Sequence, residues 1–572
     1  MEVVENENYK PPHANEDGLE RDEAVTEKLV AQSDGTKITF TNSKADGKDR
    51  NGDAKIEIQG VESQFVGLSK EELMKYANDP FWVRLRMTLF VLFWVLWLAM
   101  LVGAVAIIVL TPRCAPPPRL AWWQSSPVYN VEVASYADGN ADGRGDIAGL
   151  TSKLKYIKEL GMRTLLLSDI FSKDANGATK DYLEVDPSLG TLTDVEALLN
   201  STKEKELHVV LEINPAYTSR DHQWFLDSSE GKDGFQDIFI WEQGDEAAPP
   251  EGVMASGESA WTYDATRKAF YLHQTSSDSA DVNWKSPKAL ELFTGVLRFW
   301  LERGVSGFLV SHTYLDRTAV SLHHTFLTEC CPSHVATTCA FNLSRLLGVR
   351  VDKVASEASP LYGSDDEPAA DLVLSKPFEQ LVGKPGATSL RGFVQETLDV
   401  TPEGMWPSFV LGSASSSRLK ERAGMLLDGL HMVAALVQGT PVFYNGDELA
   451  LECSALVGNS THLEVVRHST ALRDKLAVRL GSTVTSVLGG NSTVFVMLRV
   501  RKGTPGYMAV VNGDHEQVTV NLADASSHVP ESGHIEVKST DSTKVVQSKV
   551  KLNEFTLDAH EAVILQFVPI FE

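Results

Sequence analysis

A run of oxygen-bearing side chains at residues 138–146, "DGNADGRGD", is the first stretch with chemical potential. Asp138, Asn140, Asp142 and Asp146 follow the spacing D-x-N-x-D-x-x-x-D. Closely spaced carboxylate and amide oxygens in a glycine-rich turn are the hard ligands that calcium prefers. The same residue types also form ordinary solvated turns. The loop is therefore a candidate calcium site, and a simple turn is the alternative.

A second stretch, "GVSGFLVSH" at residues 304–312, is a short apolar run between glycines that ends in Ser311. Its composition predicts a buried strand. A serine without an adjacent base is a poor nucleophile. By itself, this expected strand end therefore offers no obvious catalytic group.

The five cysteines are the remaining reactive side chains. Cys114 lies in "TPRCAPPPRL", whose prolines favour a stiff, extended neck. Because five is an odd number, at least one cysteine has no partner within its own chain. We favour a disulfide from Cys114 to another membrane protein; a free or palmitoylated thiol and a bridge to a distal cysteine stay open. The distal cysteines, whose pairing is open, are Cys330, Cys331, Cys339 and Cys453.

The charge-free run from Met87 to Leu110 predicts a transmembrane helix over 81–110. Its 24 residues exceed the roughly 20 that a helix needs to cross a bilayer. A signal peptide or a buried core helix fits less well, because the run begins late and is long. Ala99 and Gly103, four residues apart, would let another helix approach closely.

The flanking charges and the glycosylation sequons indicate the orientation of this span. More Lys and Arg residues precede the span than follow it, which keeps the N-terminus cytosolic. Four sequons, all after the span, favour an exoplasmic C-terminal part. We therefore expect a single-pass type II plasma-membrane protein with a signal anchor. The sequon asparagines are Asn200, Asn342, Asn459 and Asn491.

The segment before the span reads as a cytosolic tail, residues 1–80. It is polar and poor in aromatics, which predicts disorder. "SKEE" at 69–72 has the form of a capping box and would start a short juxtamembrane helix. The formal charge of −25 excludes nucleic acid as a partner, because no basic stripe is present.

The pattern beyond a neck at 111–125 predicts a parallel barrel. Apolar runs at 164–171 and 208–214 read as strands, and apolar residues recur with helical spacing over 147–160. Such alternation over 126–480 predicts a (β/α)8 TIM barrel with helices outside. Residues 481–572 contain short strands separated by turns and predict a small antiparallel β-sandwich domain.

Several stretches of this region resemble the α-amylase family of glycoside hydrolases, and the resemblance covers about residues 120–572. Members of that family are retaining glycosidases, in which two carboxylates face each other about 5 Å apart. A third acid assists them. The family also has a calcium loop at the place of "DGNADGRGD". The matching stretches are 128–161, 181–199, 281–284, 297–308 and 439–451.

The resemblance implies that the catalytic groups are missing. The nucleophile follows the pattern Gly-Phe-Arg-x-Asp, whereas this chain has Leu309 and Ser311 at the arginine and aspartate positions. Ala414 stands where the third acid is expected. Glu357 in "VASEAS" is the candidate acid/base, although an exposed loop glutamate is the more ordinary interpretation. One carboxylic acid without a nucleophile cannot run the double displacement, so we expect a catalytically inactive barrel.

The N-terminal part resembles the heavy subunits of heteromeric amino-acid transporters. The resemblance rests on 67–86, the span, "TPRC" at 111–114 and the pair Trp122-Trp123. It implies a glycoprotein with no required cofactor that bonds through Cys114 to a multi-spanning light chain and brings it to the plasma membrane. The light chain would carry the substrate path, because the charge-free run at 87–110 of this chain's one span holds no ionisable residue.

Two alternatives stay open. One is a membrane-tethered glycosidase that uses other catalytic groups. The other is an adhesion or signalling receptor associated with integrin, which is compatible with the transporter role.

Overall fold

The structure is a computed structural model of the 572-residue chain. All five cysteines, Asn342, Asn459 and Ala414 lie outside the residues that it describes. The chain divides into two compact units, Met1–Ala115 and Pro116–Glu572, which are treated separately below. The described residues are 70–110, 118–168, 170–254, 257–311, 345–351, 355–363, 370–375, 386–413, 417–451 and 460–571.

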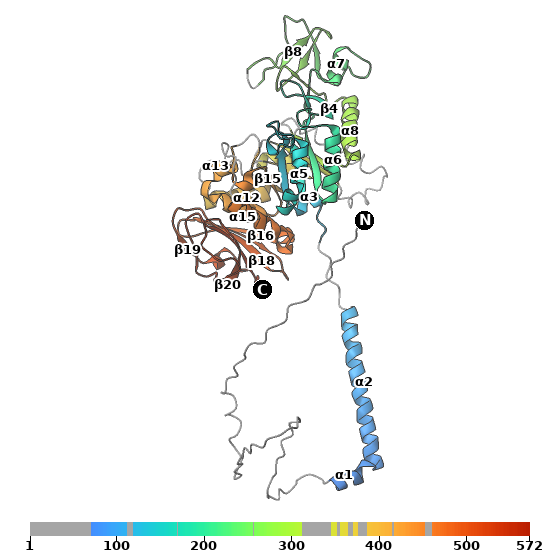
Figure 1. Cartoon of the computed structure of the whole chain (residues 1–572), viewed down its shortest axis with the longest axis vertical. Coiled ribbons are helices and arrows are strands. Elements are labelled where there is room, and N and C mark those ends of the chain that lie inside the picture. The colour runs from blue at the N-terminus through green and yellow to red at the C-terminus, as the bar shows by residue number, and fades with distance from the viewer. Residues whose placement is uncertain are drawn as a thin grey trace, which may run out of the picture. The chain divides into compact units, whose positions relative to one another are not determined.

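Two helices make up the described part of the first unit (Figure 1). The short α1 (Lys70–Ala77) precedes the long α2 (Pro80–Leu110). Asp79 ends the turn between them, and its Oδ1 accepts a hydrogen bond from the Phe81 backbone N–H at 2.9 Å. Proline suits the first helical position because that position needs no N–H. Among the described residues, α2 is the one helix long and apolar enough to span a membrane, as the sequence predicted.

Eight parallel strands form the barrel of the second unit, which confirms the predicted fold. In the sheet, β1 pairs with both β2 and β15, and the order is β13-β12-β11-β5-β2-β1-β15-β14. The two outermost strands of this order are β13 and β14. They are linked by a hydrogen bond of 2.5 Å from the Ser408 hydroxyl to the Val373 carbonyl. The strands are β1 (Val128–Glu132), β2 (Thr164–Ser168), β5 (His208–Ile213), β11 (Gly307–Ser311), β12 (Leu346–Arg350), β13 (Leu372–Leu374), β14 (Ser408–Val410) and β15 (Thr440–Tyr444).

Amphipathic helices follow the strands and cover the barrel (Figure 1). The first of them, α5, begins after Asp146, whose side chain accepts from the Gly149 N–H. The second, α6, begins with a capping box formed by Thr191 and Asp194. The helices are α5 (Ile147–Glu159), α6 (Leu192–Glu204), α8 (Pro287–Glu302), α11 (Ala355–Ala358), α12 (Ala387–Val400), α13 (Leu419–Ala423), α14 (Leu427–Leu436), α15 (Ser460–Ala471) and α16 (Leu476–Leu480).

Between β5 and α8 the chain leaves the barrel and forms a small lobe that the periodicity did not predict. Figure 1 shows this lobe, with β8 and α7, projecting beyond the barrel helices. An aromatic cluster around Phe225, Trp241 and Tyr271 holds it together. Its elements are β6 (Tyr217–Ser219), α7 (Gln223–Ser229), β7 (Trp241–Gln243), β8 (Trp261–Asp264), β9 (Ala269–Leu272) and β10 (Ser279–Asp281); the ribbon β3 (Phe171–Lys173) with β4 (Thr179–Val185) follows β2.

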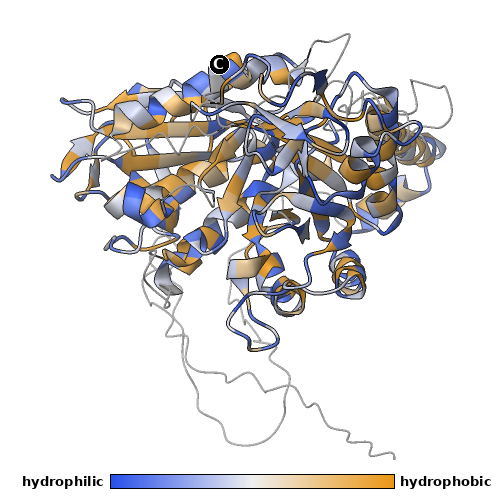
Figure 2. Ribbon diagram, turned by 90° about the horizontal axis from the view of Figure 1, so that it is seen from above, coloured by the Kyte–Doolittle hydropathy of each residue, from blue (hydrophilic) through white to orange (hydrophobic). Residues whose placement is uncertain are grey.

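The C-terminal strands form an antiparallel six-stranded sheet and a two-stranded ribbon. Along β17, Phe495 and Met497 join the core shared with the barrel, whereas Val496 and Leu498 join a second core under the ribbon. This alternation is the period of two expected of a strand covered on both faces. Figure 2 shows hydrophobic residues concentrated along the strands. The strands are β16 (Ser482–Leu488), β17 (Val494–Val500), β18 (Gly506–Asn512), β20 (Ser532–Lys538), β21 (Lys549–Lys551) and β23 (Ala562–Phe567), with β19 (Val518–Val520) and β22 (Phe555–Leu557) in the ribbon.

The floor of the barrel is closed by α3 (Trp122–Ser125), which follows the neck. Trp123 is 6% exposed and packs with inward-facing residues such as Val128, Leu309 and Val442. The Thr440 hydroxyl donates to the Trp123 carbonyl at 2.6 Å. The pair Trp122-Trp123 therefore packs at the amino ends of the barrel strands.

Candidate functional site

The carboxyl ends of the barrel strands are where TIM-barrel enzymes place their chemistry. Ser311 ends β11 there and stands in register with Arg350, the last residue of β12. The glycine that begins β11 is required, because a Cβ on Gly307 would lie 2.3 Å from the Leu346 carbonyl oxygen. The neighbour of Ser311 across the strands is thus a guanidinium, which cannot act as a base.

A polar cluster at the same end was not predicted from the sequence. Glu212 on β5 lies 3.3 Å from an Nη of Arg350, and both side chains are less than one-fifth exposed. The Ser168 hydroxyl is shared between Glu212 Oε2 at 3.0 Å and Asn130 Oδ1 at 2.9 Å. Within the described residues, Arg350 Nε and Nη2 make no hydrogen bond, so the contact to Glu212 is an ion pair without hydrogen-bond geometry.

The other positions carried over from the hydrolases lie in different surroundings. Leu309 is 2% exposed and packs inside the barrel with Trp123. Glu357 is exposed on the short α11. Ala414 lies outside the described residues. In the described part of the chain, the structure therefore places Ser311 in register with a cationic residue and leaves Glu357 on the surface.

Two adjacent acids follow β15 in the short helix η4 (Asp447–Leu449). Glu448 is fully buried; it accepts hydrogen bonds from the Tyr129 hydroxyl at 2.8 Å, the Tyr156 hydroxyl at 3.1 Å and the Gly446 N–H at 2.9 Å. Burial raises the pKa of Glu448 and that of Tyr129. This network ties the end of the last strand to the first strand and its helix, so its role is structural.

Asp447 is 1% exposed, and neither of its carboxylate oxygens has a hydrogen-bond partner among the described residues. Burial, followed by repulsion from Glu448, raises the pKa of Asp447 to about 7, against the attraction of Arg418 and Arg422. Both guanidiniums donate instead to backbone carbonyls, those of Asn445 and Leu411, each at 2.6 Å.

The candidate calcium loop is held by its own hydrogen bonds. Asp138 accepts from the Ala141 and Gly143 N–H groups at 2.6 and 2.8 Å. Asp146 accepts from the N–H groups of Gly139 at 3.0 Å, Asn140 at 3.1 Å and Gly149 at 2.6 Å.

Asp142 in turn accepts from the Arg144 N–H at 2.8 Å and from the Asn140 side-chain amide at 3.1 Å. In the part of the chain that the structure describes, no group of three or more His, Cys, Asp or Glu side chains could hold a metal. A calcium ion would have to compete with these N–H donors for the loop's oxygens, so the calcium site stays a prediction.

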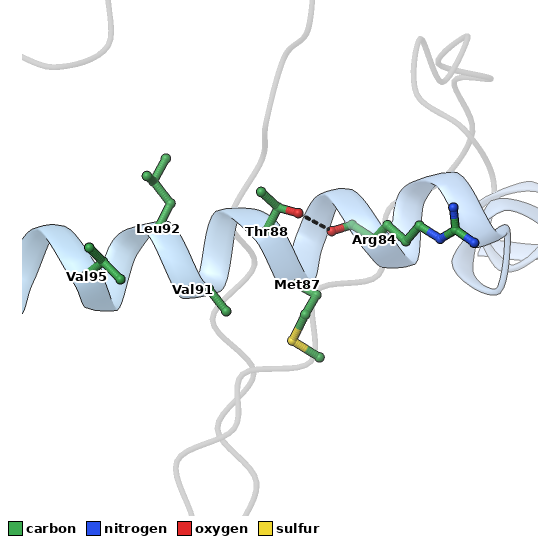
Figure 3. A pocket seen from close by; sticks show the side chains of 6 residues that line it. All are labelled: Arg84, Met87, Thr88, Val91, Leu92 and Val95. Carbon is green, nitrogen blue, oxygen red and sulfur yellow. Dashed lines mark hydrogen bonds between the residues drawn. The ribbon is translucent and has the colours of Figure 1, made fainter.

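Of the remaining predicted positions that the structure describes, Ala99 is exposed and Gly103 is half-buried. Ala99 and Gly103 are four residues apart on α2. A hollow of about 540 Å³ follows one side of the same helix, and Figure 3 shows its lining residues, among them Arg84, Met87 and Val95, projecting from successive turns. Of the sequons, Asn200 on α6 and Asn491 in the turn before β17 are exposed.

Two family models match this chain. Residues 53–129 match the N-terminus of solute carrier family 3 member 2, and residues 131–317 match the catalytic domain of alpha amylase. The first match ends and the second begins within β1 (Val128–Glu132).

Curated relatives fall into two groups. The amino acid transporter heavy chain SLC3A1 of Rattus norvegicus is 28% identical over 431 residues, 68% of this chain and 62% of that protein. The heavy chain SLC3A1 of Homo sapiens is 28% identical over 450 residues, which is 70% of this chain and 63% of that protein. The chain thus spans less than two thirds of these relatives. An alpha-glucosidase of Culex pipiens is 25% identical over 542 residues, 79% of this chain and 91% of the enzyme.

Solved structures share the fold. Trehalulose synthase MutB from Pseudomonas mesoacidophila superposes with a TM-score of 0.64 at 20% identity, over 78% of this chain and all of that chain. The second unit is thus an α-amylase-type barrel with a C-terminal β region. The resemblance of this chain to the heavy subunits of amino-acid transporters is confirmed by the N-terminal family match together with the heavy-chain relatives.

Proposed function

We propose that this protein is the heavy subunit of a heteromeric amino-acid transporter, a single-pass type II glycoprotein of the plasma membrane. In this role it carries a multi-spanning light chain to the cell surface and stabilises it there. The observation that carries the proposal is the combination of one apolar span, matched to a solute carrier N-terminus, with an α-amylase-type barrel. The light chain supplies the substrate path.

The absence of glycosidase activity belongs to the same proposal. Retaining hydrolysis needs two facing carboxylates. Ser311 faces Arg350 across neighbouring strands, and Glu357 is exposed. The Glu212 carboxylate forms an ion pair with Arg350 and accepts a hydrogen bond from the Ser168 hydroxyl. Its interactions are therefore with barrel residues. The alternative glycosidase role predicts hydrolysis of maltose or isomaltose that Glu357→Gln abolishes.

The link to the light chain is proposed to be a disulfide from Cys114. Native membranes solubilised in detergent are run on a non-reducing gel beside a Cys114→Ser sample. A heavier band that collapses with reductant and is absent from the variant supports the link, and mass spectrometry of that band identifies the partner. The matched control is Cys453→Ser, which removes a distal cysteine and keeps Cys114.

A monomer band in both lanes contradicts the disulfide-linked model. In that case the proteins that co-purify with the Cys114→Ser variant are identified by mass spectrometry, and an integrin among them favours the adhesion role.

Chelation by EGTA tests whether the protein needs calcium. Because the loop at 138–146 is satisfied by its own N–H groups, transport and the melting temperature are expected to stay unchanged in EGTA, whereas a lower melting temperature supports structural calcium.

A further inference from the structure

Two turns at one end of the C-terminal domain bring two histidines together. His515 lies between β18 and β19, and His560 lies between β22 and β23. His560 Nε2 and His515 Nδ1 are 2.8 Å apart, and the ring centroids are 4.4 Å apart. His515 is exposed and His560 is half-buried, so solvent reaches the pair.

The two turns are fastened to each other independently of the imidazoles. The side-chain amide of Asn512, which is fully buried, donates to the carbonyls of Glu516 and Asp558, each at 2.8 Å. The His560 N–H donates to the Asp514 carbonyl at 3.0 Å. The histidines are therefore held in place by backbone that would keep its shape without them.

The backbone at His560 is itself unusual. Its φ is +56°, in the left-handed region, where residues other than glycine are uncommon and asparagine, aspartate and histidine are the most enriched of them. A histidine there costs conformational energy that a glycine would not. A glycine can therefore replace His560 without backbone strain.

We propose that His515 and His560 form a binding site for a divalent transition-metal ion, zinc or copper. Imidazole nitrogens lie about 2.0–2.1 Å from zinc, so two of them on one ion lie about 2.9–3.4 Å apart at octahedral or tetrahedral angles. The observed 2.8 Å separation is close to that range. Imidazole also suits copper and zinc, whereas carboxylate and carbonyl oxygens suit calcium and magnesium.

The proton between the rings must move when the ion binds. In the metal-free pair, one facing nitrogen donates its N–H to the lone pair of the other. Binding converts the donating ring to its other tautomer through solvent, which the exposed His515 allows, and each facing nitrogen then gives a lone pair to the metal. Water completes the coordination, because in the described residues no third His, Cys, Asp or Glu joins the pair in a metal-binding group.

The test is a titration of the chelator-treated, detergent-solubilised full chain. Calorimetry measures the dissociation constant of zinc, added as zinc chloride. Electron paramagnetic resonance shows whether nitrogen atoms ligate added copper. His515→Ala and His560→Gly should each raise the zinc dissociation constant at least about tenfold, since even altering outer-shell partners costs 10–100-fold. Glycine suits the positive φ, so His560→Gly should also fold normally, as circular dichroism would check.

His534→Ala is the matched control, because His534 is an exposed histidine on β20 of the same domain. Its zinc affinity should equal that of the unaltered chain. The proposal is overturned if the chain shows no saturable binding of either ion, or if both pair variants bind as tightly as the control. Neither result bears on the transporter role.

Discussion

Replacing His431 with leucine should stabilise this protein. His431 lies on α14, is fully buried, and has its ring stacked on Phe443 with centroids 5.3 Å apart. Neither of its ring nitrogens has a hydrogen-bond partner among the described residues. An uncompensated buried polar group costs about 1–3 kcal/mol on the evidence of protein mutations. Leucine has a similar volume, so His431→Leu should gain about 1–2 kcal/mol at pH 7.5.

The gain should grow in acid. Burial, and then the neighbouring His462, hold the pKa of His431 well below its ordinary value, against the attraction of Asp428. An unfolded chain takes up this proton below about pH 6.5 and the folded chain does not, so stability falls as the pH falls below that value. For a ring that stays neutral when folded, the loss is about 2 kcal/mol at pH 5. His431→Leu removes this loss.

Besides Glu448, three buried aspartates of the described residues act in the opposite direction. Burial raises their pKa values, so the folded chain binds protons that the unfolded chain releases, and each adds stability as the pH falls toward its unfolded pKa. Both proteins contain these groups, so their effect cancels when the variant is compared with the parent at each pH. They are Asp281 and Asp371, with pKa values of about 6, and Asp447, with a pKa of about 7.

Urea unfolding followed by tryptophan fluorescence, at pH 7.5 and 5.0, measures both effects. The advantage of His431→Leu should widen from about 1–2 to about 3–4 kcal/mol. His222 is the matched comparison: its pKa is lowered to about 4, but its Nδ1 accepts the Trp224 N–H at 3.1 Å. His222→Leu loses that bond and should be less stable at pH 7.5. A destabilised His431→Leu, or an advantage independent of pH, would refute the reasoning.

Three further changes test other parts of the barrel. Trp123→Ala should cost about 3–5 kcal/mol in urea unfolding because it empties the barrel floor, and a cost below 1 kcal/mol would contradict that packing. Tyr129→Phe removes a hydrogen bond to buried Glu448 and should cost about 1–3 kcal/mol by the same measurement. Ser311→Asp should leave maltose hydrolysis at background, because the candidate acid/base Glu357 is exposed on α11 and no second carboxylate is expected to face the new one; measurable turnover would contradict an inactive site.

Local patterns predicted the elements well where burial follows one periodicity. The apolar spacing over 147–160 became α5 (Ile147–Glu159), and the runs at 164–171 and 208–214 became β2 and β5. The charge-free run became part of α2. This helix begins earlier, at Pro80, because Asp79 and the proline start it ahead of Arg84 and Arg86. These predictions succeed because the buried faces of helices and strands leave a regular spacing of apolar residues in the sequence.

The polar contacts of the site could not be predicted in the same way. Glu212 and Arg350 meet only because β5 and β12 flank β11 in the closed barrel, an order that neither segment encodes locally. The hydrogen bond from Tyr129 to Glu448 spans 319 positions of the chain. His515 and His560 likewise meet only after the β18–β19 and β22–β23 connections are joined by Asn512. Each pair depends on tertiary closure.

The same structure shows how the barrel would tolerate the proposed loss of hydrolase chemistry. Its interior is filled from the floor by Trp123 and by inward-facing side chains that include Leu309, the position where the resemblance expects arginine. An apolar side chain there avoids the cost of burying a charge. Glu212 and Arg350, two charges near the strand ends, are paired with each other. Much of the apolar packing thus lies below the strand ends that carry catalysis in TIM-barrel enzymes, and the barrel can stay rigid without catalytic groups there.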